Sequence, residues 1–78
     1  MTYTIHYYGQ DGTIYHTKSG ITWEHLGAEI YKGSTDKCKY IIIEDLQGYE
    51  YIIDSYDIAS GDYSNYDLPI DILDVLEV

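Results

Sequence analysis

The side chains best suited to acid–base chemistry near neutral pH are three histidines, His6, His16 and His25. None of them belongs to a zinc-protease, dithiol, Ser-His-Asp or glycine-rich phosphate-loop pattern. Acidic side chains are so numerous that any two could be nominated as general acid and base, so such a pair carries no information. We therefore expect no catalytic residue and no cofactor, and the sequence favours a protein that is not an enzyme.

The candidate metal ligands are oxygens in a polar segment of the second half. Four aspartates of that segment could suit Ca²⁺: Asp54, Asp57, Asp62 and Asp67. Their spacing does not match the EF-hand loop. His6 and His16 could approach each other across a hairpin, but two histidines without a third ligand make a weak site. We expect no metal site, and a Ca²⁺-binding module stays open as an alternative.

Acidic residues that alternate with tyrosines form the most distinctive pattern of the chain. Between Glu50 and Asp67, each carboxylate lies next to a tyrosine or one residue away from it. Carboxylates can pair with arginine bidentately, and tyrosine rings can stack on cations. The predicted partner-binding residues are Glu50, Asp54, Tyr56, Asp57, Asp62, Tyr63, Tyr66 and Asp67.

The charge is divided unequally along the chain. The 78 residues hold 14 acidic side chains against four lysines, for a net charge of −10. Residues 1–39 balance to zero, whereas residues 40–78 contain no basic residue. Such a field attracts cationic partners and repels nucleic acid and anionic lipid. We expect a basic protein partner, with no direct nucleic-acid binding and no membrane binding.

The first half predicts a hairpin followed by a helix. Residues 2–8 and 13–17 read as paired strands, and Asp11-Gly12 favours a type I′ turn. We expect a register with Tyr8 opposite Tyr15, which places Ile5 and Ile14 in the core; a longer loop would place His6 opposite His16. The predicted helix covers 22–32. Its apolar stripe includes Trp23, Leu26, Gly27, Ile30 and Tyr31, and we expect Trp23 in the core.

The second half predicts another hairpin, a loop and a last strand. Residues 38–44 and 49–54 read as strands, the first of them apolar on both faces as a central strand would be. Residues 55–68 are polar and read as a long loop. The spacing in 69–78 fits either a helix or a short edge strand, and we expect the strand.

These elements predict one α+β domain over residues 1–78. Its antiparallel sheet would have four to five strands in the order ββαββ, with a final β, and one helix would pack on one face. The single cysteine, Cys38, is expected to be a buried residue at a strand start and suits a reducing cytosol. The N-terminal residues lack the features of a signal peptide, and no apolar run approaches the ~20 residues of a membrane span. We expect a cytoplasmic monomer or homodimer.

Small size, strong acidity, an α+β domain, many tyrosines and no enzyme motif together give the chain a resemblance to a functional class. It resembles phage-encoded inhibitors of bacterial immunity, the anti-CRISPR and anti-restriction DNA mimics. The resemblance covers general properties and carries over no residue role. It implies that the protein occupies the basic nucleic-acid groove of a defence complex in a bacterial host cell. A regulatory or structural interaction module with an inert acidic surface is the alternative.

Overall fold

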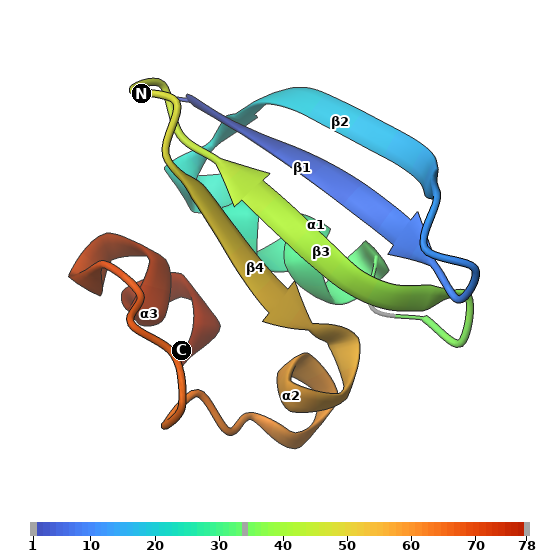
Figure 1. Cartoon of the computed structure of the whole chain (residues 1–78). Coiled ribbons are helices and arrows are strands. Elements are labelled where there is room, and N and C mark those ends of the chain that lie inside the picture. Colours follow the sequence, from blue (N-terminus) through green and yellow to red (C-terminus); the bar gives the residue numbers. More distant parts are fainter. Residues whose placement is uncertain (1, 34, 78) are drawn as a thin grey trace.

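The computed structural model describes residues 2–33 and 35–77, which form a four-stranded antiparallel sheet and three helices. The strands stand in the order β2-β1-β3-β4 (Figure 1). The α+β class predicted from the sequence is confirmed. The elements are β1 (Thr2–Gly9), β2 (Ile14–Thr22), α1 (Trp23–Gly33), β3 (Cys38–Glu44), β4 (Glu50–Asp54), α2 (Ser55–Ser60) and α3 (Ile70–Leu76).

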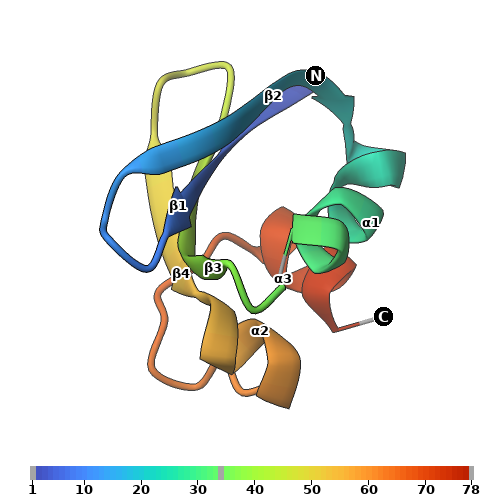
Figure 2. The same cartoon turned by 90° about the vertical axis from the view of Figure 1, so that its right-hand side faces the viewer.

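The helices lie on one side of the sheet, and the other side is left uncovered (Figure 2). In β1 buried and half-buried residues alternate strictly, as expected for a strand with one face in the core. Cys38 is buried at the start of β3, as expected. The core between the sheet and the helices contains Tyr3, Ile5, Tyr7, Ile21, Leu26, Ile30, Cys38, Ile41, Ile43, Ile53, Ile58, Tyr63, Ile72 and Leu76.

The first hairpin has a different register from the predicted one. Tyr8 pairs with Ile14 rather than with Tyr15, and the prediction that Ile14 joins Ile5 in the core is wrong, because Ile14 is 49% exposed on the uncovered side. The alternative that placed His6 opposite His16 is wrong as well, since His6 pairs with Thr17. The turn explains the shift. Its loop is closed by the Gly9 N–H donating to the Thr13 carbonyl, and a bulge follows within the ladder.

The helix α1 agrees with the prediction in its span, while its aromatic residues lie at the margins of the core. Leu26 and Ile30 are fully buried, but Trp23 is 42% exposed, which corrects its expected core position. The Trp23 indole N–H donates to the carbonyl of Asp71 in α3. A methyl group on Gly27 would lie 3.1 Å from the Val75 carbonyl, so this glycine allows close approach of α3.

Two corrections concern the second half. The predicted loop 55–68 begins with the short helix α2, whose N-cap Asp54 accepts from the Tyr56 N–H and whose C-cap Gly61 has φ 74°. The predicted final strand is the helix α3, in which Ile72 and Leu76, four residues apart, are both buried. A strand would have pointed these two side chains to one face as well, so the periodicity alone did not separate the alternatives.

Candidate partner-binding surface

The side of the sheet that no helix covers, here called the open face, contains side chains from all four strands. Figure 1 looks onto it. Strand pairing shows which residues share it, because partners across an antiparallel ladder point to the same side. The open face consists of Thr4, His6 and Tyr8 from β1, Ile14, Thr17 and Ser19 from β2, Tyr40, Ile42 and Glu44 from β3, and Glu50, Ile52 and Asp54 from β4.

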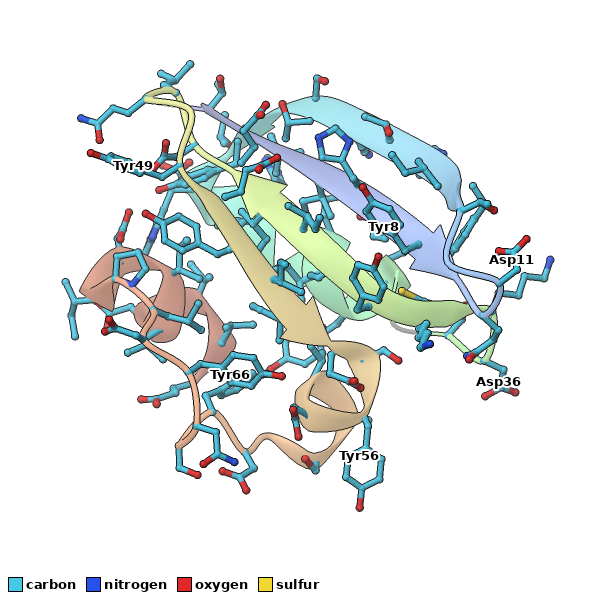
Figure 3. All side chains as sticks on the ribbon, in the orientation of Figure 1. Tyr8, Asp11, Asp36, Tyr49, Tyr56 and Tyr66 are labelled. Carbon is cyan, nitrogen blue, oxygen red and sulfur yellow. The ribbon has the colours of Figure 1, made fainter. Side chains whose placement is uncertain are left out.

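The middle of the open face is aromatic and apolar. The rings of Tyr8 and Tyr40 stack with centroids 4.6 Å apart and an angle of 13° between their planes. Beside them Ile42 is half-buried and Ile52 is 58% exposed. Tyr8 stands on this side of the sheet in Figure 3. Large exposed apolar side chains that adjoin one another are typical of an interaction surface.

Carboxylates border this apolar centre on two sides. Glu44 and Glu50 are direct cross-strand partners at one end of the β3–β4 ladder, and Asp54 pairs with Tyr40 at the other end. Like charges directly opposite each other on a sheet are destabilising. The residue beside Glu44 on β1 is Thr4, which offers no compensating charge. The arrangement therefore suits a partner that brings positive charge.

A hollow of about 340 Å³ lies at the Asp54 end of the open face. Its walls are Tyr40, Ile42, Ile52, Asp54 and Tyr66. Tyr66 comes from the segment after α2, and in Figure 3 its ring reaches back toward the end of β4. The Tyr66 hydroxyl accepts from the Asp54 backbone N–H at 3.1 Å and donates to a carboxylate oxygen of Asp57. Burial, followed by the Asp57 hydrogen bond, raises the pKa of Tyr66, so the phenol stays neutral.

The structure brings some of the predicted binding residues together and separates others. Asp54, Asp57 and Tyr66 meet at the hollow. Glu50 is exposed at the far end of β4, and Tyr56, 77% exposed, points outward from α2 (Figure 3). The remaining two acidic residues, Asp62 and Asp67, are exposed in the segment after α2. The Asp62 carboxylate accepts from the Ser64 N–H and hydroxyl, bonds that lower its pKa.

Tyr63 belongs to the core, unlike the other predicted binding residues, which are exposed or half-buried. It is 7% exposed and packs with the ring of Tyr66 at 6.5 Å between centroids. Its hydroxyl is buried and makes no hydrogen bond of ordinary geometry with residues 2–33 or 35–77. Burial, with the nearby Tyr31 hydroxyl as a smaller cause, raises the pKa of Tyr63.

Sequence reasoning missed the part of the surface contributed by β1 and β3. Tyr8, Tyr40, Ile42 and Glu44 lie before the acidic loop and were not selected. The central position expected of the Ile41–Ile43 run is confirmed, but a central strand has only one buried face when all the helices pack on that same side of the sheet. The signal that could have found them is the alternation Tyr40, Ile42, Glu44 beside the buried Ile41 and Ile43.

A hollow larger than the one at Asp54 is on the helix side and has a different character. Its volume is about 590 Å³, and Tyr7, Tyr15 and His16 form an aromatic wall. Three of the four lysines line it, Lys18, Lys32 and Lys37. Lys18 and Lys32 pair with the largely buried carboxylate of Glu29 at 2.9 and 3.6 Å, and these pairings, Lys18 first, lower its pKa. Lys18 and Lys32 are thus paired within the chain, although both side chains stay partly exposed.

Within residues 2–33 and 35–77 no three His, Cys, Asp or Glu side chains converge closely enough to hold a metal ion. No helix in the same ranges has the length and apolar character needed to cross a membrane. Comparison with known proteins finds no matching family model, no similar curated protein and no similar solved structure.

Proposed function

We propose that the protein is a non-catalytic inhibitor that binds the basic nucleic-acid groove of a bacterial defence complex, such as a CRISPR effector or a restriction nuclease, through its open face. The observation that carries this proposal is the composition of that face: stacked tyrosines and exposed isoleucines at its centre, with Glu44, Glu50 and Asp54 around them.

The spacing of the carboxylates supports mimicry of a nucleic-acid backbone. Glu50 and Asp54 lie four residues apart on one side of β4. Alternate residues of a strand are separated by roughly 6.6–6.8 Å, so these two carboxylates start about 13 Å apart. One strand of a duplex carries a phosphate about every 3.4 Å along the helix axis, so this separation equals about four phosphate steps, a distance over which a nucleic-acid groove presents several cations. Charge in such an interface sets the association rate and the specificity.

Affinity would come from the apolar centre of the open face. Exposed ion pairs contribute only about 0–1 kcal/mol each, so a row of carboxylates by itself binds weakly. Aromatic residues that become fully desolvated at the middle of an interface contribute most. Ile52 lies between the two acidic ends, and the stacked rings of Tyr40 and Tyr8 adjoin it in the row of Asp54.

The test is displacement of DNA from purified defence complexes. A fluorescent duplex would be bound by each member of a panel of CRISPR effectors and restriction nucleases, and its anisotropy followed as the protein is added. We expect saturable release of DNA from at least one complex at a fixed stoichiometry. The control is the same titration with free duplex, whose anisotropy should not change. Absence of release across the panel contradicts the proposal.

A second candidate function is favoured by the edge strand β2. This strand has nine residues, nearly all of them exposed, and it forms one edge of the sheet. An exposed edge can pair with another strand, which would make the protein an interaction module that dimerises. Sedimentation equilibrium over a wide concentration range distinguishes the dimerising module from the inhibitor. A dimer formed through β2 would dissociate on dilution. A protein that is monomeric at every concentration would favour the open face as the interaction surface.

A further inference from the structure

We propose that the hollow at the Asp54 end of the open face is a subsite for one arginine side chain of the protein partner. The inference deepens the proposed function and rests on it only for the existence of a basic partner. The hollow holds about 340 Å³ and combines two tyrosine rings, two isoleucines and one carboxylate. Each of these groups matches a different part of an arginine side chain.

The carboxylate of Asp54 is fixed and has acceptor capacity left. One of its oxygens, Oδ1, accepts from the Tyr56 backbone N–H at 2.9 Å, which caps α2 and sets the side-chain rotamer. A carboxylate has about four lone-pair positions, so several remain for a forked donor. The guanidinium group presents its N–H donors in a rigid fork that matches a carboxylate.

The tyrosine rings are held in place as well. The Tyr66 hydroxyl is occupied on both sides, accepting from the Asp54 N–H and donating to Asp57. Tyr40 is fixed by its stack on Tyr8. Rings whose positions are set before binding lose little entropy when a cation packs against them. A planar guanidinium stacks on such rings more favourably than the compact, strongly hydrated ammonium of lysine.

The isoleucines suit the aliphatic stem of the same side chain. Ile42 and Ile52 are cross-strand partners and form the apolar wall. Arginine buries its three methylene groups along apolar surface while its charged head reaches a polar group. Ile52 is 58% exposed without a partner, and an arginine stem laid across it would cover this surface. Asp57, next to Tyr66, adds a second negative charge near the head group.

The experiment uses three tripeptides that differ in one side chain, Gly-Arg-Gly, Gly-Lys-Gly and Gly-citrulline-Gly, titrated into isotope-labelled protein. Chemical shifts of Tyr40, Asp54 and Tyr66 report on the hollow. We expect saturable shifts with the arginine peptide, binding weaker by about fivefold or more with lysine, and no saturation with neutral citrulline, because charge and planarity are both needed. Equal binding of lysine and arginine overturns the arginine assignment, and so does the absence of saturable shifts with arginine.

Matched variants locate the site. Asp54→Asn keeps the capping ability of residue 54 and removes its charge, so we expect arginine affinity to fall by about fivefold or more. Glu24→Gln makes the same charge change at an exposed position of α1, on the helix side of the sheet, and should alter affinity by less than about twofold. Equal losses in both variants contradict a site at the hollow. If arginine binds here but no defence complex releases DNA, the subsite stands and the proposed function fails. If a defence complex releases DNA but arginine does not bind here, only the subsite is contradicted.

Discussion

At the scale of single residues, tyrosine serves two separate purposes in this chain. Tyr3 and Tyr7 are buried in the core, where their hydroxyls donate to the Asp71 carboxylate and to the Glu29 carbonyl. Tyr8 and Tyr40 instead stack on the open face. The sequence places both kinds in strands, and only their alternation within β1 and β3 separates them. Proximity to acids alone therefore does not separate the buried Tyr63 from the exposed tyrosines.

The first residue-scale prediction concerns the buried hydroxyl of Tyr63. Because this hydroxyl makes no hydrogen bond of ordinary geometry, we expect Tyr63→Phe to leave the free energy of unfolding unchanged or raise it by up to about 1 kcal/mol. The comparison variant is Tyr66→Phe, which removes the bonds to Asp57 and Asp54 and should lower it by about 1–2 kcal/mol. Urea unfolding measures both. A clear loss of stability in Tyr63→Phe would show that its hydroxyl is paired.

A second residue-scale prediction follows from the core phenols. Burial first, and then the Asp71 hydrogen bond, raises the pKa of Tyr3 from 10.0 to about 12; burial first, and then the Glu29 charge, raises that of Tyr7 to about 12. Since the folded state favours the protonated phenols, their contribution to stability is complete below pH 10 and is lost as the pH rises toward 12. Urea midpoints measured from pH 8 to 12 should fall above pH 10. A flat profile over that interval contradicts the burial of these hydroxyls.

At the scale of secondary structure, the elements differ in how well local sequence determines them. The strands β1 and β3 and the helix α1 carry long periodic patterns, and their existence was predicted. Short elements lack that periodicity. The helix α2 has six residues and depends on caps at Asp54 and Gly61, while α3 depends on tertiary contacts. The open face was likewise unpredictable in part, because it requires knowing that α3 joins α1 on the same side of the sheet.

The attachment of α3 can be tested directly. Trp23 donates to the Asp71 carbonyl at 3.0 Å near its first turn, and Tyr31 donates to the Leu76 carbonyl at 2.7 Å near its last. We expect Tyr31→Phe to accelerate hydrogen exchange of residues 73–76 by roughly five- to tenfold, the equivalent of about 1 kcal/mol. Tyr49→Phe, at a tyrosine 62% exposed in the β3–β4 turn, is the matched control and should leave it unchanged. Unaltered exchange in Tyr31→Phe would mean that this bond does not hold the helix.

At the scale of the whole molecule, the net charge of −10 destabilises the folded state through repulsion between like charges. The lysines do not relieve it evenly, since Lys18 and Lys32 are paired with Glu29 on the helix side. These two lysines therefore do not compensate the carboxylates of the open face, which include the opposed pair Glu44 and Glu50. A protein can retain such a surface when a cationic partner compensates it.

This repulsion predicts a salt response. Raising NaCl from about 50 mM to about 500 mM shortens the screening length from roughly 14 Å to about 4 Å, so the thermal midpoint of the free protein should rise. The double variant Glu44→Gln/Glu50→Gln removes the opposed charges and should show a higher midpoint at low salt with a smaller increase. Differential scanning calorimetry provides both values. A midpoint that falls with salt would indicate that attractive pairs outweigh the repulsion.

The most direct test of the central claim compares two triple variants of equal net charge in the DNA-displacement titration. Glu44→Gln/Glu50→Gln/Asp54→Asn neutralises the open face. Asp11→Asn/Glu24→Gln/Asp36→Asn neutralises acids that are not part of the open face, and Figure 3 shows Asp11 and Asp36 at the end of the first hairpin. We expect the first variant to need about tenfold or more protein for half-maximal release of DNA, and the second to match the parent within about twofold. Equal potency of the two variants would contradict the open face as the binding surface.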